Sequence, residues 1–445
     1  MRKQYGAFTE ASYYRNPGAK IGLKCTLHGE FSKERFMWSL QKLRSIHPFL
    51  NCTIQQDDQG RCTYCETEDA EIYTEYKEKK DDQDWLAFIE RRNQVPFIMN
   101  REVPLEWGIF HNGTETDIVL QGSHILGDGL SYVNLLKDFM QIYCDKNENL
   151  PIREPRLIQG ADDFPKESAL EEEAKKKIDE INSYWETARR VHSQQEYERM
   201  YQMFHTYCGC GFIYHMIEED TFEEFLAACR ENNVKINTAL ILALVMAQDQ
   251  VSQGVIIAVN NRPLISEVPS DSLGNYASAV SCDIRYDKEK SFWENAKEMT
   301  AEIQKSLNNI KDRLHVLQVF ASLDPSVYEG IYFSRPEEAE WREKFSKLVQ
   351  PIKDADSMCT SNIGNVKIQV KNPMYRITDL VLIGQTACTS NKSIGIATIE
   401  NQCSISMWYR KSSLKRGDME QLLERVEQIL EKAVLSEETL ERYYA

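Results

Sequence analysis

The order of apolar and polar residues predicts two long helices separated by β-hairpins in the first third of the chain. Segment 33–50, KERFMWSLQKLRSIHPFL, repeats apolar residues at helical spacing and ends this pattern before Pro48. Segment 131–143, SYVNLLKDFMQIY, has the same period. Between the helices, segments 50–67 and 105–124 alternate apolar and polar residues around an Asp-Asp-Gln-Gly and an Asn-Gly turn, as hairpins do.

The second part of the chain repeats this mixture in looser form, after a linker with three prolines at 151–168. A charged helix is expected from Ser168 to Met203, and an amphipathic helix that includes Leu422 and Val426 closes the chain. Apolar segments between them predict helices at 221–232 and 236–249 and strands at 254–259, 275–284, 365–370, 379–385 and 393–409.

Strands and helices in both halves predict an α/β protein with two lobes and a cleft between them. At 445 residues the chain is longer than one hydrophobic core usually supports. We place the boundary at the proline-rich linker, so that residues 1–165 form the first lobe and residues 166–445 the second, beginning with the charged helix. The sequence has no evident internal repeat of 20 to 50 residues, so a solenoid is not expected.

The charge of the chain narrows the classes of partner. The formal net charge is −16, and nucleic-acid binding requires a basic surface, so no nucleic-acid partner is expected.

The most apolar run, 239–247, is less than half as long as a membrane span and predicts a buried helix. The first ten residues lack the apolar core of a secretion signal, and the chain has twelve cysteines. A cytoplasmic protein with reduced thiols is therefore expected.

Two cysteine-rich segments have spacings that metal sites also use. CTYC (62–65) has no second pair nearby, and Cys208 and Cys210 of segment 205–215 are expected on one face of a strand as small buried side chains. We predict no metal at either. The chain also lacks GxSxG, GxxxxGK[ST] and GxGxxG, which excludes the commonest hydrolase, P-loop and dinucleotide-binding interpretations.

The segment GSHILGDGLS (122–131) has the most pronounced chemical character. Side chains alternate along a strand, so His124 ends an apolar face at the edge of a sheet. Gly127 and Gly129 allow backbone angles that let the chain turn into the following helix. An imidazole placed there can take a proton from a hydroxyl or amine and return it. The residues alone leave a second interpretation open: a histidine satisfied by backbone hydrogen bonds, followed by an ordinary Asp-Gly turn.

His124-Ile-Leu-Gly-Asp128-Gly129 resembles the HxxxDG motif of the acyl-thioester-dependent acyltransferase superfamily. This superfamily includes chloramphenicol acetyltransferase, alcohol acetyltransferases, wax-ester synthases and nonribosomal peptide condensation domains. Segments 40–52, 259–285 and 360–366 resemble further family elements in the expected order. The resemblance implies two chloramphenicol-acetyltransferase-like αβ sandwich lobes that form a pseudo-dimer, with a channel between them. The acyl thioester and the acceptor would enter this channel from opposite sides and meet at His124.

The resemblance also implies roles for individual residues. His124 is the general base, and Asp128 forms a structural ion pair with Arg262, with Arg285 as the second choice. Gly129 completes the motif. Candidates for stabilising the oxyanion or lining the channel are Thr360, Ser361, Asn362 and Asn275. Without the resemblance, a polar turn before strand 365–370 explains the first three equally well, and an Asn after Gly is more often a simple turn.

The leading functional hypothesis is an acyltransferase that moves an acyl group from acyl-CoA, as co-substrate, to a small-molecule alcohol or amine. No permanently bound cofactor and a monomer are expected. A condensation-type enzyme with a carrier-protein-bound donor is the alternative; such domains usually have two adjacent histidines, and here Ser123 stands in place of the first. A third hypothesis is a family member that binds a ligand or partner without catalysis.

Overall fold

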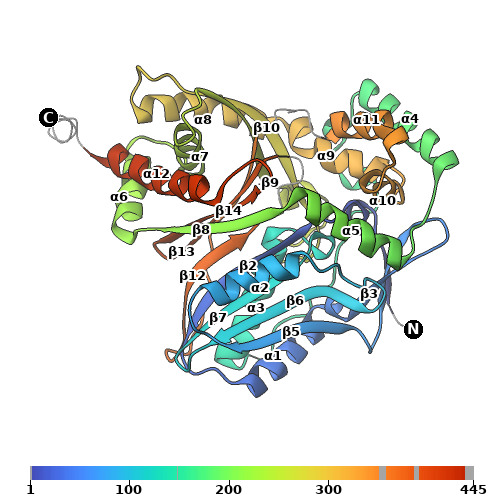
Figure 1. The fold of residues 1–445 in the computed structure, drawn as a ribbon, viewed down its shortest axis with the longest axis horizontal. Helices are drawn as coiled ribbons and strands as arrows, with labels where there is room; N and C mark the ends of the chain where they lie inside the picture. The colour runs from blue at the N-terminus through green and yellow to red at the C-terminus, as the bar shows by residue number, and fades with distance from the viewer. Residues whose placement is uncertain (1–2, 148, 350–356, 385–389, 436–445) are drawn as a thin grey trace.

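Two β-sheets form the cores of two lobes in the computed structural model, which describes residues 3–147, 149–349, 357–384 and 390–435 (Figure 1). The first lobe has a five-stranded sheet and the second a six-stranded sheet, and a three-stranded sheet lies beside the first. Both sheets carry helices, as predicted for an α/β protein with two lobes.

The strands occur in three sets. The five-stranded sheet has the order β12 (Arg376–Ile383), β2 (Lys20–His28), β7 (Glu115–Ser123), β6 (Glu102–His111) and β5 (Glu71–Glu78). The six-stranded sheet has the order β10 (Ala277–Arg285), β9 (Ser252–Asn260), β11 (Met358–Asn365), β13 (Lys392–Ile399), β14 (Gln402–Arg410) and β8 (Cys210–Ile217). The small sheet has the order β1 (Gln4–Gly6), β4 (Cys62–Glu66) and β3 (Cys52–Gln56).

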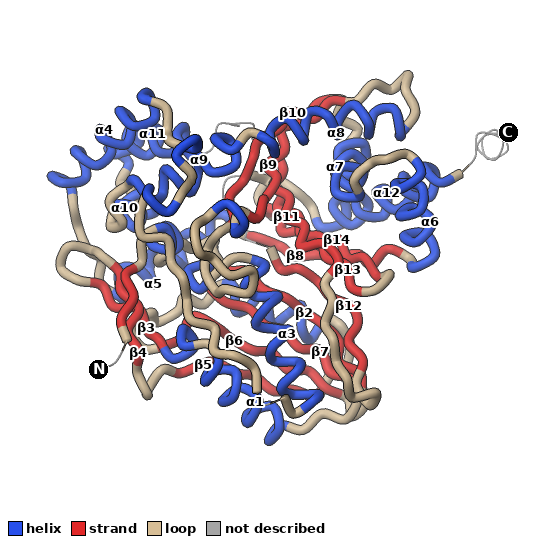
Figure 2. The backbone as a smooth tube through the Cα atoms, turned by 180° about the vertical axis from the view of Figure 1, so that it is seen from behind, coloured by secondary structure: helices blue, strands red, loops and turns tan. Residues whose placement is uncertain are grey.

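The helices of the first lobe lie on both faces of its sheet. Helices α1 (Lys33–Ile46) and α3 (Gly129–Asp145) cover one face, as the view from behind shows (Figure 2). Helix α2 (Gln83–Asn93) packs on the other face. Strand β7 is therefore buried on both sides: Ile118 and Leu120 belong to the core of α1 and α3, whereas Val119 packs with α2.

The second lobe is covered by α6 (Glu219–Glu231), α7 (Ile236–Met246), α8 (Phe292–Asn308) and α12 (Arg416–Val434). Helix α7 is apolar on all sides and buried from Thr238 to Val245, which confirms the prediction of a buried helix. The four helices and one face of the six-stranded sheet share a hydrophobic core.

Strand β12 joins the two lobes. It follows β11 of the six-stranded sheet along the chain but pairs antiparallel with β2 of the first lobe. Its Val381 and Ile383 pack with Trp85 of α2 and with Phe212 and Trp408 of the second lobe. A hydrophobic cluster between the sheets thus connects the lobes. The division at residue 165 stays a prediction; it counts β12 with the second lobe, although β12 pairs with the sheet of the first.

Four helices form a group that packs against the first lobe, at the upper right of Figure 1: α4 (Glu172–Ala188), α9 (Ile310–Ser322), α10 (Val327–Tyr332) and α11 (Ala339–Val349). Many of their buried side chains, Trp185, Tyr328 and Trp341 among them, belong to the core of the first lobe although they follow residue 165 in sequence. The sequence pattern did not predict α9, α10 or α11.

Several predicted elements are confirmed within a few residues. These are the helices at 33–46, 129–145, 219–231 and 236–246, the hairpins β3–β4 and β6–β7, and the strands at 252–260, 277–285 and 376–383. The predicted strand 393–409 is a hairpin of two strands, β13 and β14.

Three predictions were wrong. The charged helix 168–203 is two helices, because Ser193 begins α5 (Gln194–Cys208) with a capping box to Glu196. The strand predicted at 365–370 lies earlier, at Met358–Asn365, and residues 366–370 have no regular structure. Cys208 and Cys210 do not share a strand, since Cys208 ends α5 and Cys210 begins β8.

Among the described residues, no helix is long and apolar enough to cross a membrane.

Candidate active site

His124 lies where β7 ends and a single 3-10 turn, η3 (His124–Leu126), begins. Its backbone amide donates to the carbonyl oxygen of Ala19 at 2.6 Å, which holds the turn against the start of β2. A Cβ on Gly122 would lie 2.5 Å from both the Pro104 carbonyl oxygen and the Tyr132 hydroxyl. The missing side chain at 122 therefore lets the helix and the neighbouring strand approach this end of β7.

Asn275 fixes the orientation and the tautomer of the His124 ring. The Asn275 Nδ2 group donates to the His124 carbonyl oxygen at 2.6 Å, which turns its Oδ1 toward His124 Nδ1, also at 2.6 Å. Because an amide oxygen only accepts hydrogen bonds, the imidazole proton is on Nδ1. Nε2 is left unprotonated, and no described residue bonds to it. The prediction placed Asn275 in the channel wall or a turn; its observed contact is with His124.

The surroundings of His124 favour its neutral form. The ring is partly exposed but closely surrounded, and burial lowers the pKa of His124 below its usual 6.5, with the charge of Asp128 and the bond to Asn275 opposing this decrease. The residue is thus a neutral imidazole with a free lone pair near neutral pH, as a general base requires.

Asp128 forms the predicted ion pair with Arg262. The two oxygens of Asp128 accept from Arg262 Nη1 and Nη2, each at 2.8 Å, and both side chains are buried. Asp128 is also the N-cap of α3, because its Oδ1 accepts from the Ser131 amide at 3.0 Å. Burial acts to raise the pKa of Asp128, but Arg262 and these amide donors outweigh it and hold the pKa below its usual value.

The ion pair links the first lobe to the second. Arg262 lies in a 3-10 turn, η6 (Arg262–Leu264), that follows β9 of the six-stranded sheet. The loop after it returns Tyr276, whose backbone amide donates to Asp128 Oδ2 at 3.0 Å. Arg285, the second choice of partner, is exposed at the end of β10.

Gly129 is the first residue of α3 and has no positive φ angle, so it does not use the backbone freedom that a glycine allows there. A Cβ at Gly129 would lie 3.4 Å from the side chain of Ile363. Strand β11 of the second lobe therefore passes directly beside the His124–Gly129 loop.

The three candidate residues on β11 differ in direction. Thr360 is buried, and its hydroxyl donates to the Ile256 carbonyl oxygen at 3.3 Å. Asn362 points the same way along the strand and donates its Nδ2 to Asn237 Oδ1 at 3.0 Å. Ser361 points to the opposite face, is partly exposed, and bonds to no described residue. Of the three, only Ser361 has a side chain with no bond to a described residue, so its hydroxyl is available to a substrate, whereas Thr360 and Asn362 are held by protein partners.

Tyr13 is a site residue that the sequence did not indicate. It ends a 3-10 helix, η1 (Thr9–Tyr13), and its ring stacks on the His124 imidazole with centroids 4.2 Å apart and planes 10° from parallel. Ser131 was also missed, and its hydroxyl accepts from Arg262 and donates to the Gly274 carbonyl oxygen. The capping position three residues after Asp128 was a signal for Ser131; nothing in the local pattern indicated Tyr13.

In the described part of the chain, no group of three or more His, Cys, Asp or Glu side chains is arranged to hold a metal ion. Cys62 and Cys65 are three residues apart on β4 and so face opposite sides of the sheet. His205 contacts the Pro17 carbonyl oxygen at 3.1 Å, and His215 contacts Glu427 at 2.6 Å.

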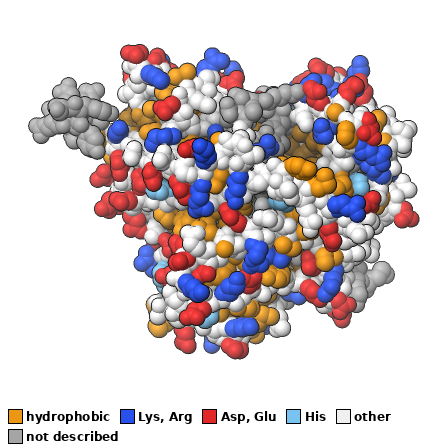
Figure 3. Space-filling model, in the orientation of Figure 1, with side chains coloured by type: hydrophobic (Ala, Val, Ile, Leu, Met, Phe, Trp, Pro, Cys, Tyr) orange, Lys and Arg blue, Asp and Glu red, His pale blue; other side chains and the backbone are white. Residues whose placement is uncertain are grey.

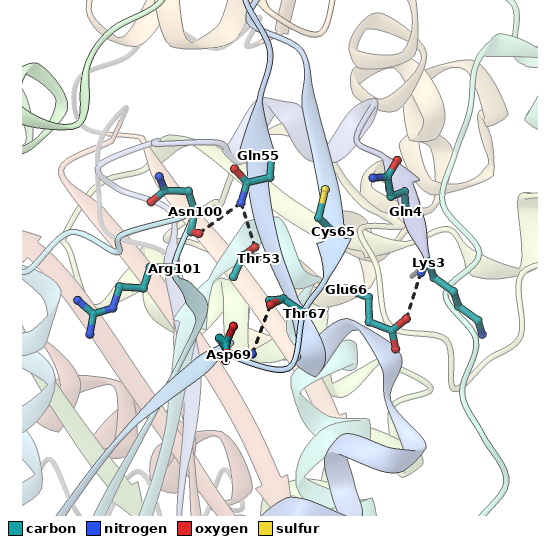
Figure 4. A pocket seen from close by; sticks show the side chains of 10 residues that line it. All are labelled: Lys3, Gln4, Thr53, Gln55, Cys65, Glu66, Thr67, Asp69, Asn100 and Arg101. Atoms are coloured by element: carbon teal, nitrogen blue, oxygen red, sulfur yellow. Dashed lines mark hydrogen bonds between the residues drawn. The ribbon is translucent and has the colours of Figure 1, made fainter. Parts of the chain in front are cut away.

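A surface hollow lies away from these residues, on the three-stranded sheet (Figure 4). Some bonds join residues of its lining: Gln55 Nε2 donates to Thr53 Oγ1 at 3.2 Å, and the backbone amide of Lys3 donates to the Glu66 carboxylate at 3.0 Å. No predicted site residue lines this hollow. The channel to His124 stays a prediction.

Comparison with known proteins gives the same architecture. The model of the condensation-domain family matches residues 20–322. The first condensation domain of the CDA synthetase is similar in structure, with a TM-score of 0.65, 11% identity, and 98% of this chain and 96% of that chain covered. The TRI3 trichothecene 15-O-acetyltransferase from Fusarium sporotrichioides is similar with a TM-score of 0.64, 12% identity and the same coverage.

The epimerization domain from the third module of tyrocidine synthetase B is also similar, with a TM-score of 0.62, 12% identity, and 98% and 96% of the two chains covered. No curated protein matches the sequence. At such identities the structures show the fold, which is the predicted one.

Proposed function

Because the chain belongs to the condensation-domain family, we propose that it is an acyltransferase that moves an acyl group from a thioester to a hydroxyl or amine, with His124 as the general base. The observation that carries this proposal is the tautomer of His124. Asn275 holds the imidazole proton on Nδ1, so that Nε2 is free to take a proton from the hydroxyl or amine substrate.

The proposed reaction needs no covalent enzyme intermediate. His124 Nε2 takes the proton of the acceptor as its oxygen or nitrogen attacks the thioester carbonyl carbon. The carbonyl π electrons move to oxygen, and the tetrahedral intermediate then reforms the carbonyl and breaks the C–S bond. The leaving thiolate takes the proton back from the imidazolium. Ser361 is our candidate donor to the oxyanion, and no resident cofactor is required.

Acyl-CoA is the donor that we propose first. Ser123 replaces the first of the two adjacent histidines that condensation domains usually have, and an O-acetyltransferase is among the similar structures. Lysine and arginine side chains are interspersed with acidic ones over the face in Figure 3, so the net charge of −16 does not make that face uniformly acidic. A nucleotide-bearing thioester is compatible with such a surface.

A donor bound to a carrier protein is the second candidate, and the family match favours it. Two further structures of the CDA synthetase condensation domain, in complex with substrate analogues, are similar to this chain. A protein that binds a ligand without turnover is the third candidate; the presence of His124, Asp128 and Gly129 together counts against it, and so does the unbonded Nε2 of His124, which suits a general base.

The test is thiol release from acetyl-CoA and longer acyl-CoAs in the presence of a panel of alcohols and amines. The wild type is compared with His124→Ala, and His28→Ala is the matched control, since His28 bonds to Thr378 at the far end of β2. Loss of a general base lowers the rate by about 10²–10⁴-fold.

We expect acceptor-dependent release in the wild type and the control and a loss of that size in folded His124→Ala. Equal release in His124→Ala would remove His124 from the chemistry. Release only from an acylated carrier protein would favour the second donor, and binding without release from either donor would favour the third hypothesis.

A further inference from the structure

The 3-10 helix η1 (Thr9–Tyr13) contacts the proposed base directly. Its last residue, Tyr13, lies flat on the His124 imidazole at 4.2 Å. No described residue bonds to the Tyr13 hydroxyl, and the side chain is partly exposed. The two rings therefore interact by stacking alone, and this stacking restricts rotation of the imidazole about its χ2 angle.

Glu10, one turn earlier on η1, faces the other member of the His124–Asn275 pair. Its side chain is fully buried, and its Oε2 accepts from Thr9 Oγ1 at 3.2 Å. The backbone amides of Asn275, Phe8 and Glu10 itself also face the carboxylate. Oε1 has no hydrogen-bond partner among the described residues. Burial raises the pKa of Glu10 to about 7, and the amide donors oppose this increase.

A buried carboxyl group with an unbonded oxygen destabilises a fold and needs an explanation. Glu10 does not serve an ion pair, because no basic side chain is bonded to it in the described part of the chain. Within the described chain, its one hydrogen bond is to the Thr9 hydroxyl of η1, and the backbone amide of Asn275, from the second lobe, faces the carboxylate. The group therefore connects η1 to the residue that sets the His124 tautomer.

Contacts with α10 hold η1 in place. Arg15, two residues after Tyr13, forms a buried ion pair with Glu329 of α10 at 2.7 Å. The hydroxyl of Tyr332, also on α10, donates to the Ser12 carbonyl oxygen. Helix α10 thus holds η1 in place through contacts at Ser12 and Arg15.

We propose that η1 positions the His124–Asn275 pair for catalysis, with Tyr13 fixing the plane of the imidazole and Glu10 fixing the backbone of Asn275. This inference rests on the proposed function, since it assigns η1 a part in that reaction. Tyr13 and Glu10 are positioning residues: each acts through His124 or Asn275 and neither exchanges a proton with substrate.

The test uses the full chain labelled with ¹³C,¹⁵N-histidine, and His124→Gln identifies the His124 resonances. Tyr13→Leu removes the stacked ring, and Glu10→Leu removes the acceptor while filling its space. Tyr13→Phe and Glu10→Gln are the conservative partners, because they keep the ring and an amide oxygen. Folding of each variant is checked by circular dichroism.

We expect Tyr13→Leu to move the ring protons of His124 downfield as the ring current is lost, and Glu10→Leu to weaken the Nδ1–H tautomer signal. Both are expected to lower kcat at least tenfold with little change in KM, and the conservative variants are expected to recover most of the loss. A KM effect without a kcat effect would indicate substrate contact and overturn the proposal.

Unchanged His124 resonances in both leucine variants would also overturn the proposal, as would changed resonances with an unchanged kcat. The spectra do not depend on turnover. If the wild type transfers no acyl group to any acceptor, the proposed function fails on its own, and the spectra still decide whether η1 positions His124.

Discussion

Replacing Asp128 by Asn removes one charge from the buried ion pair while it keeps the shape of the side chain. Four strong contacts change at once: the two Arg262 nitrogens at 2.8 Å and the amides of Ser131 and Tyr276 at 3.0 Å. All four are donors. The side-chain NH₂ group that Asp128→Asn introduces would face a donor in either orientation, and Arg262 would keep a buried charge with no counter-ion.

The size of the effect follows from burial. The side chains of Asp128 and Arg262 are 2% and 3% exposed, and breaking such a pair by removing one partner costs about 3–5 kcal/mol. The Arg101–Glu71 pair is the control: its side chains are 64% and 60% exposed, and Glu71→Gln should cost less than about 1 kcal/mol.

The assay is urea denaturation of the full chain followed by tryptophan fluorescence and circular dichroism. Besides Asp128→Asn, it includes Arg262→Met and the double variant. Because the double variant leaves neither charge alone, its loss should fall short of the sum of the two single losses by at least ~2 kcal/mol. Additive losses, or a single loss as small as that of Glu71→Gln, would refute the argument.

The pH dependence gives a second measurement on the same variants. The pKa of Asp128 is lower in the folded chain than its usual 3.8, so its contribution to the free energy of unfolding is present above pH 3.8 and is lost as the pH falls below it. Asp128→Asn should lack this part of the acid sensitivity. Identical acid profiles in the two proteins would contradict the assigned direction.

Four further predictions follow from the same site. Asn275→Ala should lower kcat/KM by about 10²-fold, because the imidazole loses the bonds that orient it; an unchanged steady-state rate would contradict this. Ser361→Ala should lower kcat by about 10²–10³-fold, whereas Thr360→Val, whose hydroxyl bonds to the core, should stay near the wild type; equal effects would remove Ser361 as the oxyanion donor. The acid limb of the kcat/KM profile should have its midpoint below pH 6.5, because the pKa of His124 is lowered and protonation removes the base; a midpoint above 6.5 would be inconsistent with this site. As the pH rises from 5 to 8, the wild type should lose about 2–3 kcal/mol of stability that Glu10→Gln keeps, since the folded pKa of about 7 exceeds the usual 4.5; parallel pH profiles in urea denaturation would show that Glu10 does not titrate there.

The sequence predicted those elements whose pattern reflects one local environment. Helix 33–46 has a single buried face, and the β6–β7 hairpin has an Asn-Gly turn between two apolar strands. Strand β11 was misplaced because its segment Met358–Asn365 is rich in polar residues, which are unusual in a buried strand. They occur here because one face of β11 points toward the His124 loop. That environment comes from the other lobe and is invisible in the local pattern.

By itself, the sequence determined the two-lobed α/β class through its pattern of strands and helices. Its resemblance to a known family implied the family and the pair Asp128–Arg262, because the residue types of a motif can be read in the sequence whatever the fold. Only the tertiary structure decided the rest. It turned Asn275 toward His124, separated Ser361 from Thr360, paired β12 with the opposite lobe, and brought Tyr13 onto the imidazole from 111 positions earlier in the chain. These contacts depend on where distant segments meet, and hydrophobic periodicity reports only whether a residue is buried, not which residue it is buried against.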